Sequence, residues 1–120
     1  MSGKKKILLC IDDEATGLMI RKMILERSGY SVLTAQDGPE GLDLFRSEAV
    51  DAVVVDYYMP KMDGGTVAST MKKLRPTVPI VMLSAYLNLP EGSLSAVDAF
   101  ITKGQSPEIL LEKLQAILDA

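Results

Sequence analysis

Five polar side chains are spaced along this chain so that they could share one reactive site. Each follows a short apolar run, and the five are Asp12, Asp13, Asp56, Ser84 and Lys103. Carboxylates brought together repel one another, by roughly 4 kcal/mol for two unit charges ~4 Å apart at an effective dielectric near 20, so one becomes protonated or a cation joins them. A hard divalent cation suits an all-oxygen site, and Mg²⁺ keeps several waters and shares the oxygens of a phosphoryl group. The residue types therefore predict a magnesium site that could handle phosphate chemistry.

Asp56 is the predicted nucleophile of this site. It directly follows three valines at residues 53–55, an apolar run typical of a strand that is covered on both faces. A carboxylate there can attack phosphorus and form an acyl phosphate, and phosphoryl transfer needs mostly positioning and charge neutralisation. Mg²⁺ and Lys103 would supply that neutralisation, and the hydroxyl of Ser84 could donate a hydrogen bond to a phosphoryl oxygen.

The chain must fold so that these distant residues converge. Apolar runs predict strands, at residues 7–11, 31–35, 51–55, 79–83 and 99–101. Helical spacing and start or stop signals predict helices, at residues 14–28, from residue 39 onward, and at 65–74, 90–97 and 106–118. This alternation predicts an α/β domain with a doubly wound, five-stranded parallel sheet, helices on both faces and right-handed crossovers. The carboxyl ends of the strands then share one edge, where ligands bind in open α/β sheets.

Glycine and proline positions predict several boundaries of these elements. Gly29 is placed to end the first helix in a left-handed turn. Pro39 and Pro107 suit the first positions of two helices. At Asp63 we expect a turn in which Gly64 supplies a positive φ.

Each of the five site residues also has a simpler role. Asp12 and Asp13 could cap a helix and satisfy its free N–H groups. Asp56 and Ser84 could be turn residues, and Lys103 could be a solvated surface lysine. For any one residue alone the simpler role is favoured, because short motifs carry a high risk of false positives. Their joint placement after four predicted strands favours the shared site.

Bulk composition limits the function classes. The 120 residues, of which 48% are hydrophobic, predict a single domain over residues 1–120 with a real core and an N-terminal tail at residues 1–5. The net charge of −3 argues against direct nucleic-acid binding, and no segment approaches membrane-spanning length.

The sequence has no His, which excludes His-based catalysis and His metal sites. Cys10, the only cysteine, is expected in the core, and the lack of any internal disulfide fits a cytoplasmic location.

Together with further motif residues, the five site residues make this sequence resemble the receiver domain of two-component response regulators. The resemblance covers residues 6–118 and rests on the five site residues together with Met59-Pro60, Met62-Asp63-Gly64, Ala85 and Phe100. It implies a flavodoxin-like receiver fold with strand order 2-1-3-4-5. It also implies a phosphorylation-dependent signalling switch that is not an enzyme, because such a domain at most catalyses its own phosphorylation and dephosphorylation.

The resemblance implies roles for individual residues. Asp56 would accept a phosphoryl group from a phosphohistidine of a sensor histidine kinase or a phosphotransfer protein. The Mg²⁺ ligands would be Asp12 (through water), Asp13, Asp56 and the backbone carbonyl of Tyr58. Ser84 and Lys103 would contact the phosphoryl group. Phosphorylation would pull Ser84 inward and change the rotamer of Phe100, which would alter a face that binds a downstream protein.

Three features depart from the family pattern. Gly104 follows Lys103 where the family usually has Pro after a cis peptide; a cis bond to a non-proline residue costs about 2.5–4 kcal/mol, so we expect a trans bond. Phe100 stands where Tyr is more common, which keeps the ring and loses the hydroxyl. The segment between Ser84 and Phe100 is short and poor in helix formers. Many receivers dimerise or bind targets through this segment, so the sequence leaves open whether the protein forms a homodimer.

Two other functions are consistent with the same residues. A Mg²⁺-dependent phosphohydrolase with an aspartyl-phosphate intermediate commonly has a second Asp two residues after the nucleophile, but Tyr58 occupies that position. A degenerate receiver that only scaffolds partners is favoured slightly by Gly104 and by the weak helix at 90–97, and is disfavoured by the intact site residues. Because the chain ends just after the last expected helix, we expect no output domain. The protein would then be either a stand-alone regulator or a receiver excised from a longer chain.

Overall fold

The fold alternates strands and helices along the chain, as the sequence predicts. The computed structural model describes residues 5–119, so most of the expected tail, residues 1–4, lies outside the described residues. The elements in this range are β1 (Ile7–Ile11), α1 (Ala15–Arg27), β2 (Ser31–Ala35), α2 (Gly38–Ser47), β3 (Ala52–Val55), α3 (Gly64–Leu74), β4 (Ile80–Ser84), β5 (Ala99–Thr102) and α4 (Pro107–Leu118). The predicted strands are confirmed to within one residue at each end.

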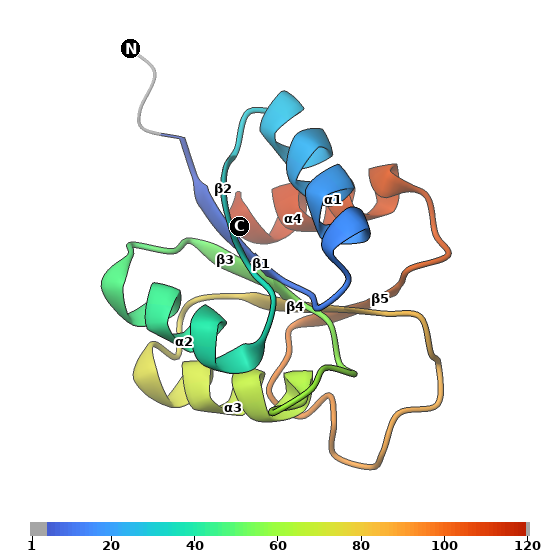
Figure 1. Ribbon diagram of the computed structural model, residues 1–120. Coiled ribbons are helices and arrows are strands. Elements are labelled where there is room, and N and C mark those ends of the chain that lie inside the picture. The colour runs from blue at the N-terminus through green and yellow to red at the C-terminus, as the bar shows by residue number, and fades with distance from the viewer. Residues whose placement is uncertain (1–4, 120) are drawn as a thin grey trace.

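The strands form one parallel sheet in the order β2-β1-β3-β4-β5 (Figure 1), which confirms the predicted topology. The register pairs Ile11 with Val55, and Val55 with Met82. Because the ends of these central strands lie side by side, the residues that follow β1, β3, β4 and β5 reach the same edge of the sheet.

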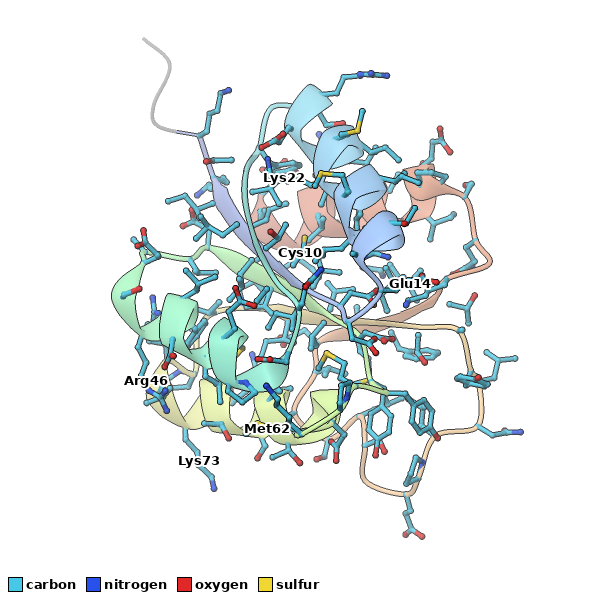
Figure 2. All side chains as sticks on the ribbon, in the orientation of Figure 1. Cys10, Glu14, Lys22, Arg46, Met62 and Lys73 are labelled. Atoms are coloured by element: carbon cyan, nitrogen blue, oxygen red, sulfur yellow. The ribbon has the colours of Figure 1, made fainter. Side chains whose placement is uncertain are left out.

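Two layers of helices cover the sheet (Figure 1). Helices α1 and α4 pack on one face and α2 and α3 on the other, and each face has its own buried apolar cluster. Cys10 lies on β1 (Figure 2) and belongs to the cluster on the α1 and α4 side. It has no exposed surface, and burial raises the pKa of its thiol to about 12, so it is a core residue and not a reactive one. Within residues 5–119, no helix combines the length and the apolar character that a membrane crossing requires.

Several local signals act as the sequence indicates. Gly29 ends α1 with φ +103°, a conformation that L side chains rarely adopt. The side chain of Asp37 caps α2 by accepting a hydrogen bond from the N–H of Glu40 at 2.8 Å, and Pro39 follows in the first turn. The peptide bond between Lys103 and Gly104 is trans, in keeping with the expectation for a non-proline residue.

The prediction of a positive φ at Gly64 is wrong. Gly64 is the first residue of α3, and Asp63 caps that helix by accepting a hydrogen bond from the N–H of Thr66 at 2.8 Å. The left-handed residue in this connection is Lys61, with φ +72°. Glycine is needed at position 64 for space, because an added Cβ would overlap the carbonyl oxygen of Asp56. The start of α3 is therefore pressed directly against the backbone of the predicted acceptor.

The predicted helix at residues 90–97 is also wrong. All of residues 85–98 are described, and they form loops and turns with no helix between β4 and β5. Their hydrogen bonds span three residues, as from Ser93 N–H to the carbonyl of Pro90 at 3.1 Å. Gly92 has φ +84°, outside the helical region, and so interrupts any regular helix. Tyr86 and Leu87, at the start of this stretch, are largely exposed.

Candidate functional site

The sheet positions the backbone of the predicted site residues. Asp12 follows β1, Asp56 follows β3, Ser84 ends β4, and Lys103 follows β5. The three residues that follow a strand each continue the parallel ladder by one further hydrogen bond, from Asp12 N–H to Ala35 O at 3.1 Å, from Asp56 N–H to Ile11 O at 3.0 Å, and from Lys103 N–H to Ser84 O at 2.8 Å. The positions of these residues are therefore set by the strands and not by flexible loops.

Three carboxylates meet at this edge. One oxygen of each of Asp12, Asp13 and Asp56 lies within 4.8 Å of the others. Asp12 has no exposed surface, Asp56 is 7% exposed, and Asp13 faces solvent. Two buried acids and one exposed acid form an all-oxygen donor set that is open on one side. Such a set is compatible with a hard divalent cation that retains water, such as Mg²⁺.

Lys103 joins two of these acids. Its Nζ lies 2.8 Å from Oδ2 of Asp12 and 3.5 Å from Oδ1 of Asp56. Burial alone would lower the pKa of Lys103, but the hydrogen bond to Asp12 and the charges of both acids outweigh burial and raise it. Lys103 therefore stays protonated and places a positive charge between the two buried acids.

Arg21 is a member of this cluster that the sequence reasoning missed. Its Nη1 lies 3.4 Å from Oδ2 of Asp12, and its side chain is only 14% exposed. The sequence contained a signal for it: Arg21 lies between Leu18 and Leu25 at helical spacing, which places it on the same face of α1 as these two buried residues. A charged residue on the buried stripe of a helix needs a buried partner.

The other predicted residues lie at the same edge without joining the charged cluster. Ser84 has no exposed surface, and its Oγ accepts a hydrogen bond from the N–H of Tyr86 at 3.2 Å. Tyr58 is 47% exposed, and its ring stands edge-to-face with that of Tyr86, with centroids 5.2 Å apart. Phe100 is partly buried within β5, where it pairs with Met82.

The surroundings of Asp56 disfavour the ionised form of its carboxyl group. Burial, followed by the negative charge of Asp12, raises its pKa from 3.8 to about 6. Lys103 and a backbone hydrogen bond from Tyr57 act in the opposite direction but do not offset these effects. In the absence of a metal, ionised Asp56 is therefore held in an unfavourable environment.

This environment predicts that the contribution of Asp56 to stability falls as the pH rises. Between pH 3.8 and about pH 6 the folded state keeps a proton on Asp56 that the unfolded state has lost. The stabilising contribution of this proton is therefore complete below pH 3.8 and is lost as the pH rises through about 6. Since one pKa unit corresponds to about 1.4 kcal/mol, we expect a loss of about 1 to 3 kcal/mol over this pH range. Urea unfolding in EDTA from about pH 4 to about pH 7 measures it. The Asp56→Asn variant should lack this component, and identical pH profiles for both proteins would contradict the prediction.

Comparison with known proteins gives a consistent set of relatives. The family model for the response regulator receiver domain matches residues 8–115. The alkaline phosphatase synthesis transcriptional regulatory protein PhoP of Bacillus subtilis is 37% identical over 121 residues, which cover 95% of this chain and 48% of that protein. The chain spans about half of the length of the curated relatives it matches, or less.

Solved structures agree in fold over nearly the whole chain. A CheY-like response regulator receiver domain protein from Methanospirillum hungatei superposes with a TM-score of 0.91 at 34% identity, covering 97% of this chain and 95% of that one. The response regulator protein TrrA from Thermotoga maritima, in complex with Mg²⁺–BeF, superposes with a TM-score of 0.90 at 32% identity, covering 93% of this chain and 98% of that one.

Proposed function

Because this chain belongs to the response regulator receiver domain family, we propose that Asp56 accepts a phosphoryl group and that its phosphorylation switches a protein-binding face. The observation that carries the proposal is the meeting of Asp12, Asp13 and Asp56 with Lys103 at the carboxyl edge of the sheet. The related TrrA structure, which holds Mg²⁺–BeF, supports a metal-dependent site in this fold.

The residues present fit a resident magnesium ion. Asp13, Asp56 and the backbone carbonyl of Tyr58 would hold it, with Asp12 acting through water. When bound, the ion supplies positive charge to the acids and to the phosphoryl oxygens. The exposed position of Asp13 leaves room for the waters that Mg²⁺ keeps, and the backbone of Asp56 is held in place by its hydrogen bond to Ile11.

The transfer step uses the residues of this chain as follows. A carboxylate oxygen of Asp56 attacks the phosphorus of a phosphohistidine on a kinase or phosphotransfer protein. A new O–P bond forms, the N–P bond breaks, and the bonding electron pair leaves with the imidazole nitrogen. Lys103 neutralises the negative charge that gathers at the phosphoryl oxygens. The hydroxyl of Ser84 donates a hydrogen bond to one of these oxygens.

The switch begins at Ser84. Its Oγ accepts a hydrogen bond from the N–H of Tyr86 in the structure, so a movement of this hydroxyl toward a phosphoryl oxygen would shift the loop that follows β4 or release it. Phe100 on the neighbouring strand would then change rotamer, and the face formed by β5 and α4 would alter. A downstream protein would bind that face in only one of the two states. A sensor histidine kinase as donor and a cytoplasmic location belong to the same proposal.

Intact-mass spectrometry of the unmodified chain tests this function. After incubation with acetyl phosphate and Mg²⁺, we expect the mass of the protein to rise by one phosphoryl group, because the acyl phosphate survives as a product and not as a short-lived intermediate. Chelation of the Mg²⁺ with EDTA should prevent the gain. Steady release of inorganic phosphate from varied phosphate esters would instead indicate a hydrolase, and a protein that never gains mass would indicate a scaffold.

A further inference from the structure

We propose that Arg21 is a positioning residue, a second and fixed counter-ion for Asp12 that frees Lys103 to engage the phosphoryl group. The inference rests on the proposed phosphorylation of Asp56. Its basis is that Arg21 and Lys103 contact the same carboxylate oxygen, Oδ2 of Asp12, at 3.4 Å and 2.8 Å. Asp12 has no exposed surface, so both contacts lie inside the molecule.

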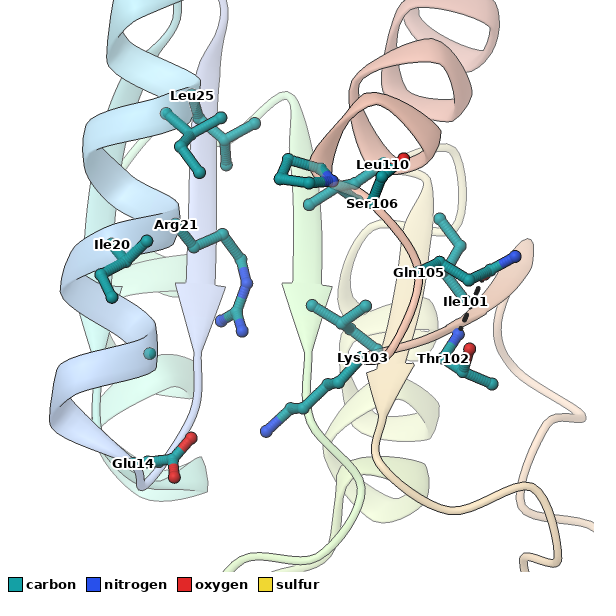
Figure 3. Close-up of a pocket in the computed structure, with 14 residues that line it drawn as sticks. Glu14, Ile20, Arg21, Leu25, Ile101, Thr102, Lys103, Gln105, Ser106 and Leu110 are labelled. Carbon is teal, nitrogen blue, oxygen red and sulfur yellow. Dashed lines mark hydrogen bonds between the residues drawn. The ribbon is translucent and has the colours of Figure 1, made fainter.

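Arg21 reaches this oxygen along the wall of a pocket and is largely shielded from solvent. It lines a cavity of about 300 Å³ between α1, β5 and the start of α4. Figure 3 shows Arg21 extending from α1 and Lys103 extending from the opposite wall, with both cationic ends directed into the space between the two walls. The side chain of Arg21 is 14% exposed and that of Lys103 is 22% exposed. Arg21 is therefore enclosed along most of its length.

The two cations differ in what else they contact. Lys103 also lies 3.5 Å from Oδ1 of Asp56, so it bridges two acids. Arg21 forms its ion pair with Asp12, and none of the recorded ion pairs within residues 5–119 joins Arg21 to Asp56. The ammonium of Lys103 is a compact charge on a flexible stem, whereas the guanidinium of Arg21 is planar and presents several donors at once. Lys103 is thus the cation suited to move, and Arg21 is the one suited to stay.

Phosphorylation makes this difference important. It replaces the single negative charge of Asp56 with a phosphoryl group of about −1.5 to −2, which draws Lys103 away from Asp12. A buried carboxylate that loses its closest cation is strongly destabilised. The contact from Arg21 keeps Asp12 paired during this movement, and so lowers the cost of transferring Lys103 to the phosphoryl oxygens.

Removal of Arg21 should therefore have two opposite effects. The unphosphorylated site becomes more negative by one charge, so the dissociation constant for Mg²⁺ should fall by about threefold to tenfold. Lys103 becomes the sole counter-ion of Asp12 and is held there, so phosphorylation by acetyl phosphate should slow by about tenfold. A merely structural loss would weaken metal binding and slow phosphorylation together.

The experiment compares Arg21→Met with Arg27→Met. Both variants remove one arginine charge from α1, but Arg27 is exposed in the last turn of the helix. Mg²⁺ binding is measured by isothermal titration calorimetry without any phosphoryl donor, and the rate of mass gain is measured with acetyl phosphate. We expect the opposite changes in Arg21→Met alone, and Arg21→Lys, which retains the charge, should return the Mg²⁺ affinity toward that of the unmodified protein.

Two results would overturn the inference. One is that Arg21→Met matches Arg27→Met in both measurements, and the other is that Arg21→Met binds Mg²⁺ more weakly. If Arg21→Met fails to fold, Arg21→Lys and Arg21→Gln supply the same comparison, because only the glutamine removes the charge. Failure of the unmodified chain to gain a phosphoryl group would instead refute the proposed function, whereas the Mg²⁺ titration would still decide whether the charge of Arg21 acts on the acidic cluster.

Discussion

The Asp56→Asn variant is expected to gain no phosphoryl group from acetyl phosphate and Mg²⁺, while the unmodified protein gains one. The amide of asparagine lacks the negative charge and the nucleophilic oxygen lone pair of a carboxylate, so it cannot form the acyl phosphate. Asp12 is not expected to substitute, because it has no exposed surface and its Oδ2 is paired with two cations. Intact-mass spectrometry on matched samples measures the difference.

Asp63→Asn is the matched control for this variant. Asp63 caps α3 through its hydrogen bond from Thr66, and asparagine caps helices about as well as aspartate. The control removes one carboxylate seven positions away along the chain while preserving the local structure, so it should be phosphorylated like the unmodified protein. A phosphoryl group on Asp56→Asn would show that the acceptor is another residue.

The Gly64→Ala variant is expected to lose about 3 kcal/mol of unfolding free energy or more, at the upper end of the usual cost of overpacking. The added methyl group would overlap the carbonyl oxygen of Asp56 and lie 2.9 Å from the Cα of Tyr57. These are backbone atoms, so no side-chain rotation can relieve the overlap. The hydrogen bond from Gly64 N–H to the carbonyl of Tyr57, at 2.8 Å, would be disturbed as well. Urea unfolding monitored by circular dichroism measures the loss.

Gly104→Ala provides the comparison for this prediction. A Cβ at Gly104 would have nothing within 4 Å, and its backbone is not in the left-handed region. The variant should therefore unfold at nearly the same urea concentration as the unmodified protein. Equal midpoints for Gly64→Ala and Gly104→Ala would mean that α3 can move away from the end of β3 at little cost.

The fold was predictable because its signals are local and mutually consistent. Continuous apolar runs mark buried parallel strands, and the regular return of helices between them limits the possible topologies. The placement of Asp12, Asp56, Ser84 and Lys103 at the strand ends followed from the same pattern, because the carboxyl ends of parallel strands share one edge.

The remaining features depend on contacts between distant segments. Gly64 has the sequence context of a turn glycine, and only the proximity of α3 to the carbonyl of Asp56 reveals why a side chain is excluded. The pairing of Arg21 with Asp12 could not be predicted from the sequence, because it depends on how α1 lies over the end of β1. At residues 90–97 the proline favoured a helix start, but the left-handed Gly92 decided the outcome.

The absence of a helix across residues 85–98 has an energetic consequence for recognition. A helix opens cooperatively, because each turn supports the next, whereas isolated three-residue turns can open one at a time. Local opening of this stretch is therefore expected to cost little free energy, and its amides should be among the first to exchange with solvent deuterium. A protein that bound here would therefore have to order this stretch, and the entropic cost of that ordering would lower its affinity.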